Sequence, residues 1–215
     1  MNYTFWIPFA VLLFSTILCD KKYGMLRDIT KATVHKPYSW SRVQMAWWTL
    51  IILSSFIAIL WQNGKAPDLH SSILILLGIS AATTASARMI DIADEEKPGT
   101  IRHQDNFGKN FFLDILSDEN GVSIYRFQTL IFNATIGGWM IAQVLANLQT
   151  CHTGDCVNDI IPLVTNNNLI LLGLSSATYA ILKSTENKST STVLTTKEEA
   201  DTVPDEAMNS TIAQG

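Results

Sequence analysis

The residue types that most often carry catalysis or bind metals are few and scattered in this chain. Its histidines, His35, His70, His103 and His152, stand far apart in the sequence. No nucleophile with a nearby base, no metal-ligand cluster and no phosphate-binding glycine loop accompanies them. The sequence therefore predicts no enzyme activity, no catalytic residue, no cofactor and no bound metal.

The cysteine pair Cys151 and Cys156 has the clearest chemistry in the chain. In an oxidising compartment such a pair forms a disulfide. His152 raises zinc as an alternative, but two sulfurs and one adjacent histidine make a poor tetrahedral site without a fourth ligand. We predict the disulfide, which leaves Cys19 unpaired.

Acidic residues cluster between positions 91 and 121. The segment 117–121, SDENG, has the composition of a calcium loop, but Leu116 and Phe127 would then occupy its first and last ligand positions, so a turn is the better interpretation. A second acidic patch is predicted to be solvated, with contact to a basic partner as the alternative. Its members are Asp91, Asp94, Glu95 and Glu96.

The remaining sequence is organised into apolar blocks, although only 47% of the chain is hydrophobic and its mean hydropathy is +0.19. Five apolar blocks are candidate membrane-spanning helices, although the third and the fifth are shorter and rich in Gly, Ala, Ser and Thr. They cover residues 3–19, 43–61, 72–87, 127–148 and 169–182. The sequence predicts an all-α membrane protein with about five transmembrane helices.

The first block could be a signal peptide instead of a membrane anchor. No Lys or Arg precedes it, and it runs directly into Asp20, Lys21 and Lys22 without a small-residue cleavage site. We therefore interpret residues 1–20 as an uncleaved transmembrane anchor.

Positive charge is divided unequally between the connections. Of 15 Lys and Arg residues, Lys65 is the one that falls in a connection predicted to lie outside, and the others fall in 20–42, in 88–126 or after residue 182. Cytoplasmic loops retain Lys and Arg. The distribution predicts an outside N-terminus and a cytoplasmic C-terminus.

Two segments are duplicated, which divides the chain into units. Residues 39–44, SWSRVQ, match 123–128, SIYRFQ, and residues 76–83, LLGISAAT, match 171–178, LLGLSSAT. Both copies enter from the cytoplasm, so they predict two parallel helical hairpins, 37–88 and 123–183. The second is longer, most simply in its outer loop. A cytoplasmic loop, 89–122, joins them, and a polar tail, 184–215, is predicted to be disordered.

The duplicated Arg-x-Gln pairs, Arg42 with Gln44 and Arg126 with Gln128, mark the points where a helix enters the membrane. The arginines can reach lipid phosphates. The glutamines, which lie deeper, can register neighbouring helices by hydrogen bonds. A pore vestibule or a ligand site is the alternative role.

Small residues recur within the predicted spans, where they allow close helix packing. In the fourth span they return every four residues and could serve contacts inside one protomer or between protomers; the third and fifth spans are predicted to be interior helices. The residues concerned are Gly78, Ala82, Ala134, Gly138, Ala142, Gly173 and Ala177.

The duplicated motifs, with SDENGVSIYRFQ between them, resemble a family of uncharacterised bacterial membrane proteins over residues 37–183. The resemblance implies a bacterial inner membrane and no particular activity. The function favoured is a membrane anchor or adaptor that forms a homo-oligomer in the lipid bilayer and docks a cytoplasmic protein. The alternative is a small oligomeric channel or membrane-permeabilising effector, for example in a defence system. No nucleic acid is expected as a partner.

Overall fold

The computed structural model of the chain describes residues 3–28, 36–96, 108, 110–118, 121–151 and 154–186. His35, His103 and His152, most of the residues 97–109 and the tail from 187 lie outside the described residues. The described helices are α1 (Tyr3–Tyr23), α2 (Trp40–Asn63), α3 (Ser71–Glu95), α4 (Phe111–Leu116), α5 (Ile124–Thr150) and α6 (Asn166–Glu186), with the short 3₁₀ helix η2 (Gly154–Asp159). The strands β1 (Ser117–Asp118) and β2 (Gly121–Val122) pair in an antiparallel hairpin.

Four helices of the described chain are long and apolar enough to cross a membrane: α1, α2, α3 and α5. This confirms an all-helical fold with several candidate spans. The predicted fifth span lies in α6, whose 21 residues reach about 31 Å at 1.5 Å per residue. Its sequence is less apolar than that of the other four, because it begins with three asparagines and is rich in Ser and Thr.

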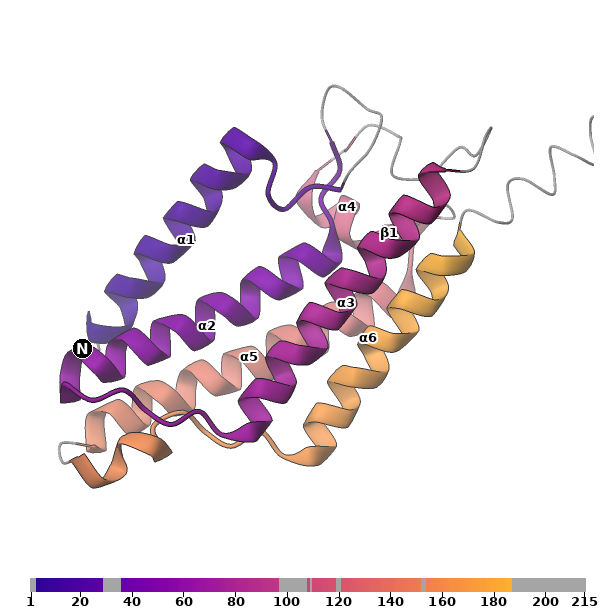
Figure 1. Ribbon diagram of the computed structural model, residues 1–215. Helices are drawn as coiled ribbons and strands as arrows, with labels where there is room; N and C mark the ends of the chain where they lie inside the picture. The colour runs from indigo at the N-terminus through magenta and orange to yellow at the C-terminus, as the bar shows by residue number, and fades with distance from the viewer. Residues whose placement is uncertain are drawn as a thin grey trace, which may run out of the picture.

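Helices α2, α3, α5 and α6 pack into a four-helix arrangement, and α1 lies against its outside (Figure 1). Helix α2 contacts α1, α3 and α5, while α6 contacts α3 and α5. Figure 1 shows that α1 and α2 meet near the start of α1 and diverge toward its end. Phe5 and Pro8 in the first turns of α1 are buried, whereas most of the residues between them and Asp20 are not.

The core of the bundle is apolar and continuous from α2 to α6. Trp48, Ile51, Leu76, Met140 and Leu172 have no solvent exposure and belong to one cluster. A second, smaller cluster joins Trp40, Ala87, Ile115 and Tyr179, and it brings α4 against the ends of α2, α3 and α6. Because the outer faces of these helices are also apolar, van der Waals contacts between the buried side chains stabilise the packing if lipid surrounds the bundle.

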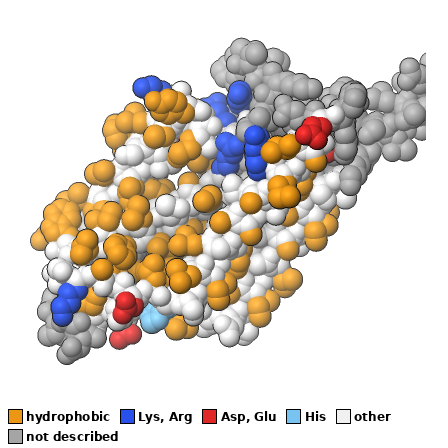
Figure 2. Space-filling model, viewed as in Figure 1, with side chains coloured by type: hydrophobic (Ala, Val, Ile, Leu, Met, Phe, Trp, Pro, Cys, Tyr) orange, Lys and Arg blue, Asp and Glu red, His pale blue; other side chains and the backbone are white. Residues whose placement is uncertain are grey.

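Hydrophobic side chains also cover much of the surface. Figure 2 shows them over most of the visible face, with Lys and Arg gathered at the upper end. A large exposed apolar surface of this kind is unusual for a water-soluble monomer. It suits helices that face lipid.

Candidate functional site at the basic end

Most positive charges of the described chain lie at one end of the bundle, here called the basic end. This end is formed by the end of α1, the start of α2, the end of α3, the start of α5 and the end of α6. It carries Lys21, Lys22, Arg27, Lys36, Arg42, Arg88, Arg126 and Lys183, while Lys65 follows α2 at the opposite end. The described residues thus keep the predicted one-sided distribution of charge.

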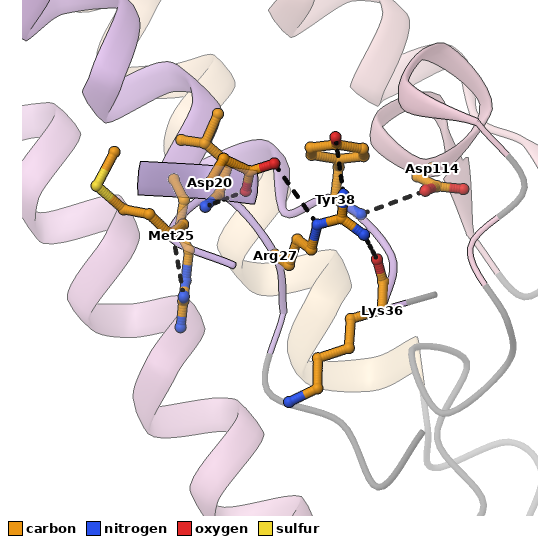
Figure 3. Close-up of polar contacts among 8 residues, drawn as sticks. Asp20, Met25, Arg27, Lys36, Tyr38 and Asp114 are labelled. Carbon is orange, nitrogen blue, oxygen red and sulfur yellow. Dashed lines mark hydrogen bonds and ion pairs between the residues drawn. The ribbon is translucent and has the colours of Figure 1, made fainter. Parts of the chain in front are cut away.

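The linker from α1 to α2 folds back on itself and is held by polar contacts among Asp20, Arg27 and Tyr38, here called the linker cluster (Figure 3). Helix α1 is followed by Gly24, whose φ of 65° suits glycine. The Asp20 carboxylate accepts a hydrogen bond from the Leu26 backbone N–H at 2.9 Å and pairs with Arg27 at 3.5 Å. Arg27 donates to the Tyr38 hydroxyl at 3.1 Å. These contacts fix the direction in which the chain leaves α1.

The linker cluster and its neighbours also contact α4 and α2. The Tyr38 backbone N–H donates to the Asp114 carboxylate of α4 at 3.3 Å, and Arg42 of α2 donates to the Met25 carbonyl at 3.3 Å. Burial, aided by the Asp20 carboxylate, raises the pKa of Tyr38, so its phenol stays protonated. Asp20, Arg27, Tyr38 and Asp114 therefore link α1, α2 and α4 (Figure 3).

A buried ion pair joins α3 to α6. Lys183 Nζ lies 3.0 Å from an Asp91 carboxylate oxygen and 3.8 Å from one of Asp28, and both Lys183 and Asp91 are 3% exposed. Asp94 is buried as well. The prediction of a solvated acidic patch is thus wrong for Asp91 and Asp94, because both are buried. For Asp91, α6 supplies a cation that lies far away in the primary sequence. Glu96 is exposed.

The duplicated Arg-x-Gln pairs occupy different environments. Arg42 is half-buried at the basic end, whereas Arg126 is buried with its guanidinium 5.6 Å from the centre of the Tyr179 ring. The interpretation that Arg126 reaches lipid phosphates is therefore wrong in this chain. Tyr179 belongs to α6, which packs against α3 and α5, so the guanidinium lies where helices meet.

The two glutamines differ in the same way. Gln44 is buried, and its amide donates to the Ser176 hydroxyl at 3.1 Å, which joins α2 to α6. Gln128 is exposed. A second interhelical contact lies outside the duplicated motifs: Trp48 Nε1 donates to Asn133 Oδ1 at 2.8 Å, and Trp47 Nε1 donates to the Asn133 carbonyl at 3.1 Å. Neighbouring helices thus satisfy the Gln44 amide nitrogen and both indole N–H groups, while Gln44 Oε1 is buried without a hydrogen-bond partner among the described residues.

The small residues singled out in the sequence mostly lie on outer faces. Gly173 is half-buried and close to Ile79. The others are exposed: Gly78, Ala82, Ala134, Gly138, Ala142 and Ala177. Close packing inside the protomer therefore finds no support for these six, and contacts between protomers, the alternative that the sequence left open for the α5 residues, stay a prediction. The close contact is made by Gly137 instead, where a Cβ would lie 2.5 Å from Trp47 Nε1.

Two cavities adjoin at the basic end and share Met25 and Arg42. The polar one, of about 210 Å³, is lined among others by Asp28, Arg88 and Asp91. The Nη1 atom of Arg88 is buried and has no hydrogen-bond partner among the described residues. The other cavity, of about 300 Å³, runs between α1 and α2 and is lined mainly by apolar side chains. Together they form a charged pocket that continues into an apolar groove.

The opposite end of the bundle holds the predicted disulfide, between Cys151 and Cys156, with Cα atoms 5.8 Å apart. Gln62 donates to the Leu148 carbonyl at 2.8 Å, which ties the end of α2 to α5 beside the disulfide. Cys19 is a free thiol. Within the described residues, no group of three His, Cys, Asp or Glu side chains could hold a metal ion.

No protein-family model, curated protein or solved structure matches this chain.

Proposed function

We propose that this chain is a five-span membrane scaffold of the bacterial inner membrane, which self-associates through α5 and docks a cytoplasmic protein at its basic end. Helix α6 is taken as the fifth span because it runs beside α3 and α5 and has sufficient length. The basic end then faces the cytoplasm, since Lys and Arg are retained there. The N-terminus lies outside.

The two duplicated motifs support a division into two parallel hairpins, α2 with α3 and α5 with α6. Helices α2 and α5 each begin directly after the duplicated serine, Ser39 or Ser123. Helices α3 and α6 each begin five residues before their LLG segment. The added length of the second hairpin falls mostly in its connection, which contains η2.

The observation that carries the proposal of self-association is the outer face of α5. Its small-residue stripe is exposed, so no helix among the described residues packs on it. The stripe consists of Ala134, Gly138 and Ala142. Beside the stripe, Gln143 is exposed and makes no hydrogen bond within the described chain. An amide that faces hydrocarbon is costly, and a partner helix that satisfies it contributes about 0.6 to 2 kcal/mol.

A pair of glycine variants tests this interface. Gly138→Leu places a large side chain in the stripe and is expected to convert the oligomer to a monomer. Gly78→Leu is the matched control, because Gly78 is also an exposed glycine with open space around its Cβ position, but on α3. The measurement is mass by light scattering in detergent and cross-linking in membranes.

Loss of the oligomer in both variants would contradict an interface specific to α5. An unchanged oligomer in Gly138→Leu would contradict self-association through the stripe. A wild-type chain that is monomeric in native-like membranes would reject the proposal of self-association as a whole.

Docking of a cytoplasmic protein is supported by the short helix α4. Its inner side is anchored by Ile115, which is buried against Trp40, Ala87 and Tyr179, while Phe112 is 65% exposed. A helix held rigidly at the basic end with an outward aromatic side chain offers a contact surface to a partner or to the lipid interface.

Pull-down from mild detergent tests docking. Phe112→Ser is expected to remove co-purifying cytoplasmic protein, and so is deletion of 184–215 together with residues 97–120. The control is Ile170→Ser, another exposed apolar residue, on α6 away from α4. An identical set of co-purifying proteins in all variants would contradict docking at this end.

A conduit through a single bundle finds less support. The polar side chains Gln44, Trp48 and Asn133, which would be needed to line it, are engaged with neighbouring helices. A conduit between protomers remains the alternative function, and a liposome flux assay on the oligomer tests it. Flux that Gly138→Leu abolishes would favour the conduit over the scaffold.

A further inference from the structure

We propose that the basic end binds one anionic phospholipid, whose phosphate contacts Arg42 and Arg88 and whose acyl chains lie in the groove beside α2. The inference rests on the proposed placement of the bundle in the membrane. It is independent of self-association and docking, because its residues lie outside the α5 stripe and α4.

The charge of the polar cavity suits a phosphodiester. Its lining includes Arg42, Arg88, Asp28 and Asp91, and Lys183 already pairs with both carboxylates. Three cations against two carboxylates leave one net positive charge, and a phosphodiester carries one negative charge. Arginine binds phosphate through two parallel N–H donors.

Arg88 gives the polar cavity an unused donor. Its Nη1 atom is buried without a hydrogen-bond partner among the described residues. A charged group left in that state is unfavourable, since burial removes its water without replacing the hydrogen bonds. A phosphate oxygen in the cavity would accept from it.

The apolar cavities suit acyl chains in position and length. The cavity between α1 and α2 starts at Arg42 and extends to Leu53. Eleven residues of helix span about 16 Å, which is close to one leaflet of a hydrocarbon core about 30 Å thick. A further cavity of about 350 Å³, between α2 and α3, shares Thr49 and Leu53 with the first. Two chains of one lipid could therefore lie on either side of this part of α2.

The groove lies between α1 and α2. Helix α1 diverges from α2 toward the basic end (Figure 1). The linker cluster holds the end of α1 there (Figure 3). A soluble phosphate compound would satisfy the arginines but would have no group to place in the apolar groove. The combination of a charged pocket and an adjoining apolar groove therefore favours a membrane lipid over a free phosphate.

Native mass spectrometry of the purified full chain tests the site. The probes are phosphatidylglycerol, which is anionic, and phosphatidylcholine, which has no net charge. The wild type is expected to retain one phosphatidylglycerol. Arg42→Gln/Arg88→Gln is expected to weaken that binding at least about tenfold, because two charged hydrogen-bond donors are lost. Lys21→Gln/Lys22→Gln is the matched control, since it removes equal charge at the same end but outside both cavities.

A second variant separates the acyl groove from the arginines. Ala46→Trp fills the cavity between α1 and α2 without changing charge and is expected to weaken phosphatidylglycerol binding as well. Thermal unfolding of each variant shows that the fold is kept. Glycerol phosphate, added as a competitor, is expected not to displace the lipid.

Equal losses in the lysine control and the arginine variant would overturn the site in favour of diffuse attraction to charge. Unchanged binding in the arginine variant would overturn it too, and so would displacement by glycerol phosphate. Failure of the membrane placement is distinguishable, because carbonate extraction of the wild-type chain from membranes reports it without any lipid measurement.

Discussion

At the scale of single residues, the contact between Lys183 and Asp91 has the largest expected effect on stability. Lys183→Met removes a buried cation and leaves the Asp91 and Asp28 carboxylates without it. Breaking a buried ion pair on one side costs about 3–5 kcal/mol. We expect a loss of this size in the free energy of unfolding, measured by denaturant titration in detergent.

The double variant Lys183→Met/Asp91→Asn is the control for this prediction. It removes both charges of the 3.0 Å pair and should be less destabilised than Lys183→Met. A single variant that unfolds like the wild type would contradict a structural role for the pair.

The same residues show why sequence reasoning misjudged this end of the bundle. Asp91 is one of several neighbouring acidic residues, a pattern typical of a solvated surface. Its partner follows 92 positions later, at the end of another helix. A pattern of neighbouring residues cannot indicate a partner so far away in the sequence.

At the scale of helices, the neighbouring glycines of α5 should respond differently to the same substitution. Gly137→Ala brings a methyl group 2.5 Å from Trp47 Nε1, so α5 and α2 must separate or repack. Overpacking of this kind costs about 1–3 kcal/mol. Gly138→Ala meets open space within the protomer and should leave its unfolding unchanged.

Thermal unfolding of the two variants, measured under conditions where the chain is monomeric, checks this prediction. Equal stability of Gly137→Ala and Gly138→Ala would show that the packing of α5 on α2 differs from that described.

The helices themselves were largely predictable, but their buried faces were not. The apolar blocks gave the positions of α1, α2, α3 and α5, because a bilayer requires long uninterrupted apolar runs. For a helix in lipid, however, the buried and the outer faces are both apolar. The periodicity that identifies the core face of a soluble helix is therefore weak, and Gly138 could not be distinguished from Gly137.

At the scale of the whole molecule, the proposed orientation predicts which end reacts from outside the cell. In a Cys19→Ser background, Lys65→Cys should react with a membrane-impermeant thiol reagent in intact cells. Lys36→Cys should react after the inner membrane has been opened, because it lies at the basic end. The disulfide between Cys151 and Cys156 should not compete for reagent unless it is reduced.

The reverse pattern of labelling would overturn the orientation but leave the packing of the bundle untouched. Labelling of both positions in intact cells would contradict a bundle that separates the two ends.

The linker cluster also connects α1 to α4. It ties α1 through Asp20 and Arg27 to Tyr38, and Tyr38 in turn to Asp114 of α4. A continuous series of polar contacts therefore runs from the end of α1, beside the apolar groove, to the helix that carries Phe112.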